Sequence, residues 1–325
     1  MTSAGPEGAG APPVIDVRNL TKRFGDKLVV DGFDMSVPRG AIYGFLGPNG
    51  SGKTTTIRMM CGLLTPDGGT GKCLGYDIVR QASEIKARVG YMTQRFSLYE
   101  DLSIRENLDF MARMYRMPKR RQRVTLALED LGLADRAKQL AGTLSGGWKQ
   151  RLALAACMIH DPELLLLDEP TAGVDPKARR DFWREIRSLA DNGVTVLVST
   201  HYMDEAVQCD HIAYIAYGRK LIDGASREIP SIVGLSTFEI SGPDLRALEE
   251  ALEDAPGVEQ VARFGSVLHA SGTDKAQLAA AVKALDGQDG VHVSERSTGL
   301  EEAFIHLMTG ASDNYAADPS RKVPS

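Results

Sequence analysis

The sequence predicts an α/β fold in residues 14–228, followed by a smaller α+β unit in residues 231–310. From Val14 onward, short apolar runs alternate with helical patterns, which is typical of a sheet whose strands are joined by helices. After Ser231 the pattern becomes βαββαβ, which is typical of a small ferredoxin-like domain. The 325 residues, of which 43% are apolar, suffice for a large domain with a smaller companion.

Composition limits the partners and the location of the chain. Residues 1–13, rich in Gly, Ala and Pro, predict a disordered tail without a secretory signal, and residues 311–325 predict a polar tail. The formal net charge of -5 gives no support for a nucleic-acid partner, and no uncharged apolar run is long enough to cross a bilayer. Four scattered cysteines without metal-type pair spacing fit a reducing cytosol, namely Cys61, Cys73, Cys157 and Cys209.

A glycine-rich loop between a predicted strand (41–46) and a predicted helix fits the phosphate-binding pattern G-x-x-x-x-G-K-[ST]. Glycines let backbone N–H groups curl around a phosphate, and the positive end of the helix dipole points at the same place. Lys53 would reach the β- and γ-phosphates, and the Thr54 hydroxyl would bind Mg²⁺. The alternative is a glycine-rich turn without function. The candidate ATP-binding residues here are Gly47, Pro48, Asn49, Gly50, Ser51, Gly52, Lys53, Thr54 and Thr55.

The helix after this loop is predicted from the stripe Ile57, Met60, Cys61 and Leu64. Residues 95–160 are predicted to be mostly helical and to interrupt the strand pattern. One helix there begins at the capping-box pair Ser103 and Glu106, and another carries a stripe at 124, 127, 128 and 131.

Acidic residues and a histidine follow two further predicted strands. The apolar run 164–167 ends in Asp168, a candidate magnesium ligand, and Glu169, which would accept a proton from the attacking water or orient it. His201 follows the strand 194–198 and would hydrogen-bond the γ-phosphate and that water. A solvated acidic loop and a satisfied surface histidine are the alternatives for these positions.

The segment Leu144-Ser-Gly-Gly-Trp-Lys-Gln-Arg151 resembles the signature motif of ABC ATPases. GPNGSGKTT, Gln94 in YMTQ, LLLLDEP, the AGVD that ends at Asp175 and the STH that ends at His201 follow the order of that family. The resemblance covers roughly residues 14–228. It implies a P-loop nucleotide-binding core with a helical subdomain (about 95–160) and an antiparallel β part near the N-terminus.

The resemblance also implies roles for further residues. Two copies would pair head to tail around two ATP molecules, each facing the partner's signature motif, where Ser145, Gly146 and Gly147 would add donors to a γ-phosphate. Phe24 matches the aromatic residue that stacks on adenine, although an ordinary core phenylalanine is the alternative. Gln94 matches a residue that touches Mg²⁺ beside the membrane partner, and Asp175 matches a loop that communicates across the dimer.

The resemblance thus implies an ATPase that uses ATP and Mg²⁺ to drive transport through a separate transmembrane permease, at the cytoplasmic face of the membrane. It would act as a homodimer or with a second ATPase subunit. GGWKQR followed by DEPTAGVDP resembles the drug-export branch. Trp148 replaces the glutamine common in the family, which leaves open what packs over the sugar.

The alternative from another class is a soluble, non-transport ABC ATPase that acts on ribosomes or nucleic acid. The basic run 116–123 is the one feature that favours it, and it is also typical of a solvated helix start. A single cassette without a long coiled coil or zinc-binding cysteines argues against it, so we expect no nucleic-acid partner. Residues 231–310 are expected to stabilise a dimer or to regulate it, because no convergent polar cluster is readable there.

Overall fold

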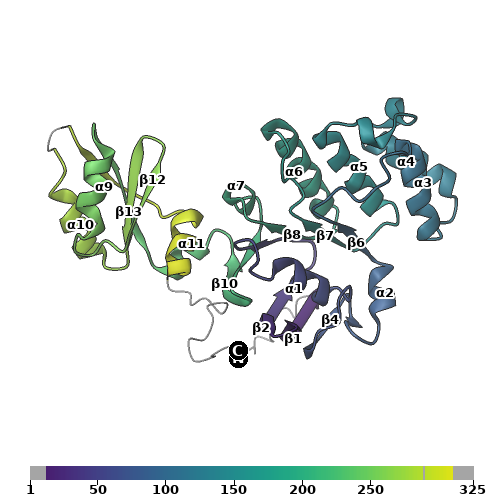
Figure 1. The fold of residues 1–325 in the computed structure, drawn as a ribbon, viewed down its shortest axis with the longest axis horizontal. Helices are drawn as coiled ribbons and strands as arrows, with labels where there is room; N and C mark the ends of the chain where they lie inside the picture. The colour runs from purple at the N-terminus through teal and green to yellow at the C-terminus, as the bar shows by residue number, and fades with distance from the viewer. Residues whose placement is uncertain (1–11, 288–289, 310–325) are drawn as a thin grey trace, which may run out of the picture.

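The computed structural model describes residues 12–287 and 290–309. All but residues 12 and 13 of the tail predicted at 1–13, and the whole of the tail predicted at 311–325, lie outside these ranges. Figure 1 shows a larger unit, built on two sheets, and a smaller unit beside it, with α11 (Leu300–Thr309) lying between them. Within the described ranges, no helix combines the length and the apolar character that a bilayer span requires.

A six-stranded sheet with the order β10-β9-β3-β8-β7-β6 forms the centre of the larger unit. All neighbouring strands are parallel except the hairpin of β9 and β10. The predicted strands at 41–46, 164–167 and 194–198 are confirmed as β3, β7 and β8. The bounds are β3 Ile42–Leu46, β6 Val89–Met92, β7 Leu164–Asp168, β8 Thr195–Thr200, β9 His211–Ala216 and β10 Arg219–Ala225.

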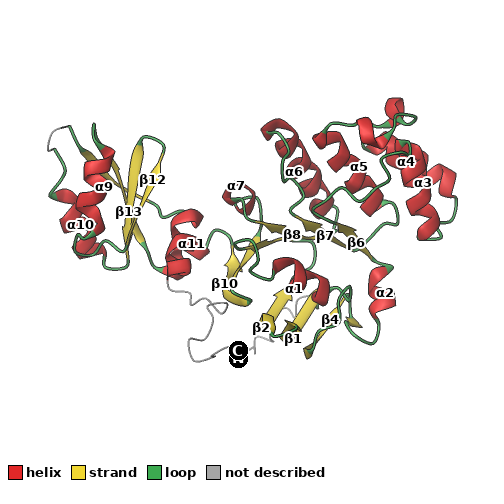
Figure 2. Ribbon diagram, in the orientation of Figure 1, coloured by secondary structure: helices red, strands yellow, loops and turns green. Residues whose placement is uncertain are grey.

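The central strands are apolar throughout because both faces of the sheet are covered. In β7, Leu164 and Leu166 belong to the core on one face, while Leu165 and Leu167 belong to the core on the other. Helix α1 (Lys53–Met60) packs into the first core and α6 (Pro176–Asp191) into the second. Figure 2 shows these helices on opposite sides of the sheet. This arrangement brings the carboxyl ends of the parallel strands to one edge.

A second, antiparallel sheet with the order β2-β1-β4-β5 packs against the first core, which confirms the N-terminal β part that the resemblance implies. Its strands are β1 Ile15–Phe24, β2 Lys27–Val37, β4 Gly68–Cys73 and β5 Tyr76–Asp77, and α2 spans Ala82–Lys86. The helix predicted through Leu64 is too long. Helix α1 ends at Met60, because Gly62 adopts a left-handed backbone with φ of +66°.

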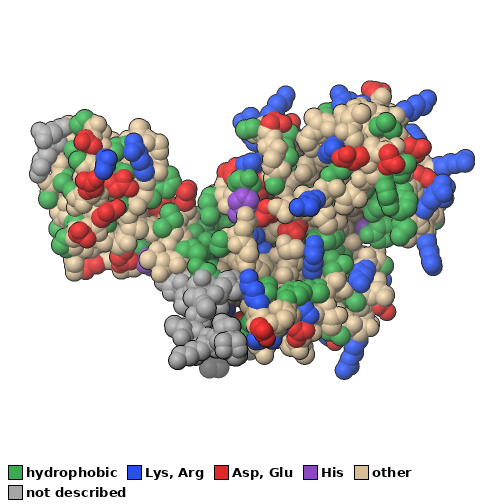
Figure 3. Space-filling view, in the orientation of Figure 1, with side chains coloured by type: hydrophobic (Ala, Val, Ile, Leu, Met, Phe, Trp, Pro, Cys, Tyr) green, Lys and Arg blue, Asp and Glu red, His purple; other side chains and the backbone are tan. Residues whose placement is uncertain are grey.

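Helices α3 (Ile104–Met114), α4 (Arg120–Asp130) and α5 (Gly146–Met158) share a separate apolar core, and two short 3₁₀ turns lie at Ala134–Arg136 and Ala141–Thr143. The predicted capping box is confirmed: the Glu106 amide donates to Ser103 Oγ at 3.2 Å and the Ser103 amide donates to Glu106 Oε2 at 2.8 Å. Figure 3 shows Lys and Arg side chains projecting from the edge where α3 and α4 lie.

The smaller unit has its own core and a four-stranded antiparallel sheet with the order β12-β13-β11-β14. This confirms the predicted βαββαβ ferredoxin-like topology. Its elements are β11 Ser236–Ser241, α9 Leu245–Glu253, β12 Gln260–Phe264, β13 Val267–Gly272, α10 Lys275–Lys283 and β14 His292–Arg296.

Helix α11 joins the two units. Its apolar face, with Leu300, Ala303 and Phe304, is buried in the core of the larger unit, and the Phe304 ring stacks on Tyr214 with centroids 4.3 Å apart. The short helices α7 (Met203–Ala206) and α8 (Ile229–Val233) contact it there. Although the sequence groups this helix with residues 231–310, its largest side chains pack on the other unit.

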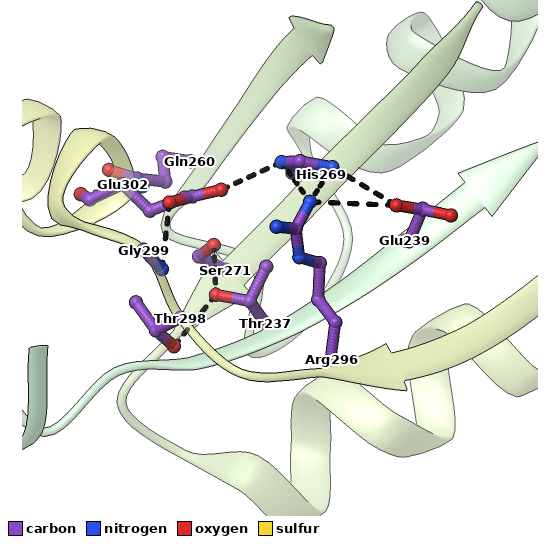
Figure 4. Close-up of polar contacts among 9 residues, drawn as sticks. All are labelled: Thr237, Glu239, Gln260, His269, Ser271, Arg296, Thr298, Gly299 and Glu302. Carbon is purple, nitrogen blue, oxygen red and sulfur yellow. Dashed lines mark hydrogen bonds and ion pairs between the residues drawn. The ribbon is translucent and has the colours of Figure 1, made fainter. Parts of the chain in front are cut away.

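The opposite side of α11 is tied to the small sheet by a polar cluster (Figure 4). Buried Glu302 accepts a hydrogen bond from the Gly299 amide at 2.9 Å and lies 2.7 Å from His269 Nδ1. Arg296 contacts His269 Nε2 and lies 3.5 Å from Glu239. This cluster, which the sequence does not reveal, holds the N-terminus of α11 to three strands of the small sheet.

Candidate active site

The phosphate-loop candidate (47–52) lies between the end of β3 and the start of α1. Glycine is required at two of its positions. Gly47 has φ of +149°, and a Cβ there would approach the Ile215 carbonyl to 2.0 Å. Gly52, the N-cap of α1, has φ of +98°, and a Cβ there would lie 2.7 Å from the Val29 carbonyl. The loop is therefore close-packed against its surroundings, with its amides at a helix N-terminus, which suits it to an anion.

Lys53 begins α1 and is buried. Its Nζ donates to the carbonyl oxygens of Gly47 at 2.7 Å and Pro48 at 3.0 Å, so the side chain folds back along the loop. Burial lowers the pKa of the ammonium group, while the charges of Glu169 and Asp168 act in the opposite direction. A buried cation at a helix N-terminus favours a strongly negative ligand.

Asp168 lies at the end of β7, where hydroxyl groups from three other elements meet it. Thr54 Oγ1 donates to its two carboxylate oxygens at 2.9 and 3.1 Å, and Ser199 Oγ donates to Oδ1. Tyr91 Oη lies 3.5 Å away. The two predicted metal ligands Thr54 and Asp168, 114 residues apart in sequence, are thus in contact. Ser199 and Tyr91 are site residues to which sequence reasoning assigned no role, although they are the first residues of the STH and YMTQ motifs.

Glu169 follows in a left-handed conformation with φ of +48°, which is rare for a residue with a side chain. Its amide donates to the Ser199 carbonyl at 3.0 Å. The Gln94 amide donates to its Oε2 at 2.8 Å, and His201 Nδ1 lies 3.3 Å from its Oε1. The structure therefore brings together three candidate residues, Glu169, His201 and Gln94, which follow the ends of three parallel strands.

Ser145, Gly146 and Gly147 lie elsewhere, at the start of α5. Ser145 is the N-cap residue, yet its hydroxyl makes no capping hydrogen bond. Together with Asp175 it lines a separate open pocket of about 350 Å³. The Asp175 carboxylate accepts hydrogen bonds from the Lys177 and Ala178 amides and so caps α6.

Two aromatic residues have clear environments. Phe24 is 52% exposed at the end of β1, which excludes the ordinary core role considered above. Trp148 is half-buried against the core of the helical region, between the guanidinium groups of Arg136 and Arg151, which lie 4.4 and 5.2 Å from its ring. Trp148 lines the same pocket as Ser145.

Comparison with known proteins places this geometry in a family. Residues 30–172 match the family model described as ABC transporter. Nod factor export ATP-binding protein I of Burkholderia orbicola is 41% identical over 297 residues, which cover 90% of this chain and 96% of that protein. The probable multidrug ABC transporter ATP-binding protein YbhF of Escherichia coli K12 is 44% identical over 225 residues, which cover 69% of this chain and 39% of that protein.

Solved structures agree with these relatives. The cbiO1 protein of Clostridium perfringens, part of the ABC transporter complex cbiONQ, is similar with a TM-score of 0.61 and 26% identity, over 69% of this chain and 95% of that one. A dimeric ATP-binding cassette in a post-hydrolysis state with ADP and Pi has a TM-score of 0.59 and 25% identity, over 65% of this chain and 98% of that one. By its motifs, its fold and its similarity to a relative along nearly the whole length of that relative, this chain belongs to the ATP-binding subunits of ABC transporters, which bind ATP and hydrolyse it.

Proposed function

We propose that this chain is the ATPase of an exporter and that it works as a head-to-tail dimer closed around two ATP molecules. The observation that carries the proposal is that the phosphate-loop site and the signature motif lie apart within one chain. The phosphate loop, Asp168 and Glu169 lie together at one sheet edge, whereas Ser145 and Gly147 line a pocket elsewhere. A second copy of the chain supplies a signature motif to each phosphate loop in this arrangement.

In the proposed site, Phe24 stacks on the adenine, and the loop 47–55 binds the phosphates with Lys53 on the β- and γ-phosphates. Ser145, Gly146 and Gly147 of the other copy contact the γ-phosphate. The exposure of Phe24 and of Ser145 supports these roles, because both must reach a ligand outside their own core. Asp175, at the start of α6 and in the same pocket as Ser145, is proposed to communicate across the dimer.

The oxygen-rich cluster of Thr54 and Asp168, with Gln94 close by on Glu169, fits Mg²⁺, which prefers hard oxygen ligands. When bound, Mg²⁺ would neutralise charge on the β- and γ-phosphates. Thr54, Asp168 and Gln94 are the residues that would hold it.

Glu169 is proposed to accept a proton from the attacking water, and His201 to hydrogen-bond that water and the γ-phosphate. Their 3.3 Å contact supports this pairing, since the two side chains already share one edge of the site. The left-handed backbone of Glu169 points the carboxylate out of the strand end, at a cost of about 1–3 kcal/mol that the surrounding hydrogen bonds offset.

Export through a separate transmembrane permease, at the cytoplasmic face of the membrane, is supported by the relatives named for Nod factor export and multidrug transport. The partner ATPase is either an identical copy or a second ATPase subunit. We further propose that residues 14–228 form the catalytic domain, with the helical subdomain at about 95–160, and that 231–310 form an accessory or regulatory domain. Action on ribosomes or nucleic acid is not favoured.

The Glu169→Gln variant tests the proposal. Loss of a positioned base lowers turnover by about 100- to 10,000-fold, while ATP binding is retained because the phosphate loop is untouched. Phosphate release measures the first effect. Size-exclusion chromatography with ATP and with ADP measures dimer formation, which we expect with ATP alone. Turnover within about tenfold of wild type, or a monomer that persists at saturating ATP, would contradict the proposal.

A further inference from the structure

Glu205 in α7 is a buried carboxylate to which neither the motifs nor the proposed mechanism assigns a role. Only 1% of its surface is exposed. Buried Thr171 donates its hydroxyl hydrogen to Glu205 Oε1, whereas Oε2 is buried without a hydrogen-bond partner. Because a buried charge with an unsatisfied oxygen is costly, this arrangement calls for an explanation beyond stability.

The bond between Thr171 and Glu205 joins two segments that start at catalytic candidates. Thr171 stands two residues after Glu169, in a turn where the Ala172 amide donates to the Glu169 carbonyl at 3.2 Å. Glu205 stands four residues after His201, in the short helix α7 that begins at Met203. The contact therefore links the segment that follows Glu169 to the segment that follows His201.

Arg179 of α6 joins the same two segments from outside. Its Nε lies 3.8 Å from Glu205 Oε1, and its guanidinium lies 4.6 Å from the Tyr202 ring. The Tyr202 ring in turn lies 4.1 Å from the ring of His201. Arg179 also pairs with exposed Asp204 at 3.0 Å. A continuous set of contacts thus runs from Thr171 through Glu205, Arg179 and Tyr202 to His201.

We infer that Glu205 is a positioning residue for hydrolysis: it ties the turn after Glu169 to the helix after His201 and so keeps Glu169 and His201 in contact. The inference rests on the roles proposed above for Glu169 and His201. Glu205 does not contact the phosphate loop, so its loss changes the chemical step and leaves nucleotide binding as it is. Substitution of a residue with a purely structural role would lower the stability of the fold without affecting the chemical step more than nucleotide binding.

The test uses Glu205→Gln, which keeps an acceptor oxygen and removes the charge, and Thr171→Val, which keeps the shape and removes the donor. We expect kcat to fall about 10- to 100-fold in Thr171→Val, as for loss of a hydrogen bond to a buried charged group, and to fall less in Glu205→Gln, whose neutral amide oxygen still accepts the bond. The KM for ATP and the affinity for a fluorescent ATP analogue stay within about twofold of the wild-type values. A hydrogen bond lost from the nucleotide-binding site itself would change them more than this. Thr171→Ser restores kcat because its hydroxyl makes the same bond. The double variant is no slower than the slower single variant, because both substitutions act on the same contact.

Glu302→Gln is the matched control. Glu302 is a carboxylate of similar burial, 3% exposed, which is bonded to His269 in the small unit (Figure 4). We expect it to lower thermal stability without changing kcat. If Glu205→Gln and Thr171→Val keep wild-type kcat, or lower kcat and ATP affinity together, the inference is overturned. Glu169→Gln in the same assay distinguishes failure of this inference from failure of the proposed function. Wild-type turnover in Glu169→Gln refutes the proposed function itself.

Discussion

Phe304 gives the sharpest test of how the two units are joined. The residue lies well beyond residue 228, yet its ring is 1% exposed and stacks on Tyr214 of β9 with an interplanar angle of 12°. Truncating such a ring to alanine removes its buried surface and leaves a cavity, which costs about 3–5 kcal/mol, and the lost aromatic contact is part of that cost. Because the cavity borders the core of the larger unit, that unit should be the one destabilised.

The expected change is readily measured by thermal unfolding. At about 2–4 °C per kcal/mol for a domain of this size, Phe304→Ala lowers the midpoint of the larger unit by about 6–20 °C. ATP should raise that midpoint again, because a ligand that binds only the folded form stabilises it by mass action. Following the melt with an ATP-responsive signal identifies which unit unfolds.

Ile305→Ala is the matched control for this experiment. Ile305 is the next residue of α11 and is 37% exposed, so its truncation opens less of a cavity. We expect it to shift the midpoint by less than a third as much, because a partly exposed side chain loses little transfer free energy. The reasoning is refuted if both variants shift the ATP-responsive transition equally, or if Phe304→Ala leaves that transition in place. The second result would assign α11 to the small unit alone.

Three further predictions concern the site and the helical region. Lys53→Met should weaken ATP binding about 10- to 100-fold, since a charge-assisted bond to phosphate is lost; calorimetry with unchanged affinity would contradict the assignment. In the hydrolysis-blocked variant with Trp183→Phe, ATP but not ADP should shift the emission of half-buried Trp148 to the blue as its pocket closes; unchanged emission in verified dimers would show a static indole. Burial lowers the pKa of His160, so below about pH 6.5 the unfolded chain binds more protons than the folded one. The free energy of unfolding therefore falls as the pH drops through this range. His160→Gln should flatten this fall in denaturant titrations, and an unchanged slope would rule His160 out as its source.

Residues close in sequence determined much of this protein. The phosphate loop, the strand ends at Asp168 and His201 and the Ser103 capping box follow from short patterns. Each depends on local requirements: positive φ, a continuous apolar strand or a helix N-terminus. The βαββαβ order of the small unit was predictable for the same reason. The length of α1 was not, because an apolar stripe continues through Leu64 although Gly62 turns the backbone away.

Only the tertiary structure decided which faces and polar groups meet. The apolar stripe on α11 indicates that one side of the helix is buried. The partner of Phe304, Tyr214 in the other unit, is decided by how the sheets pack. In the same way, nothing near Glu205 in sequence identifies Thr171 as its donor, because their contact depends on β7 and β8 lying side by side. Periodicity records how a residue is oriented on its own helix or strand, whereas a contact between distant residues depends on the packing of whole elements, which no short pattern encodes.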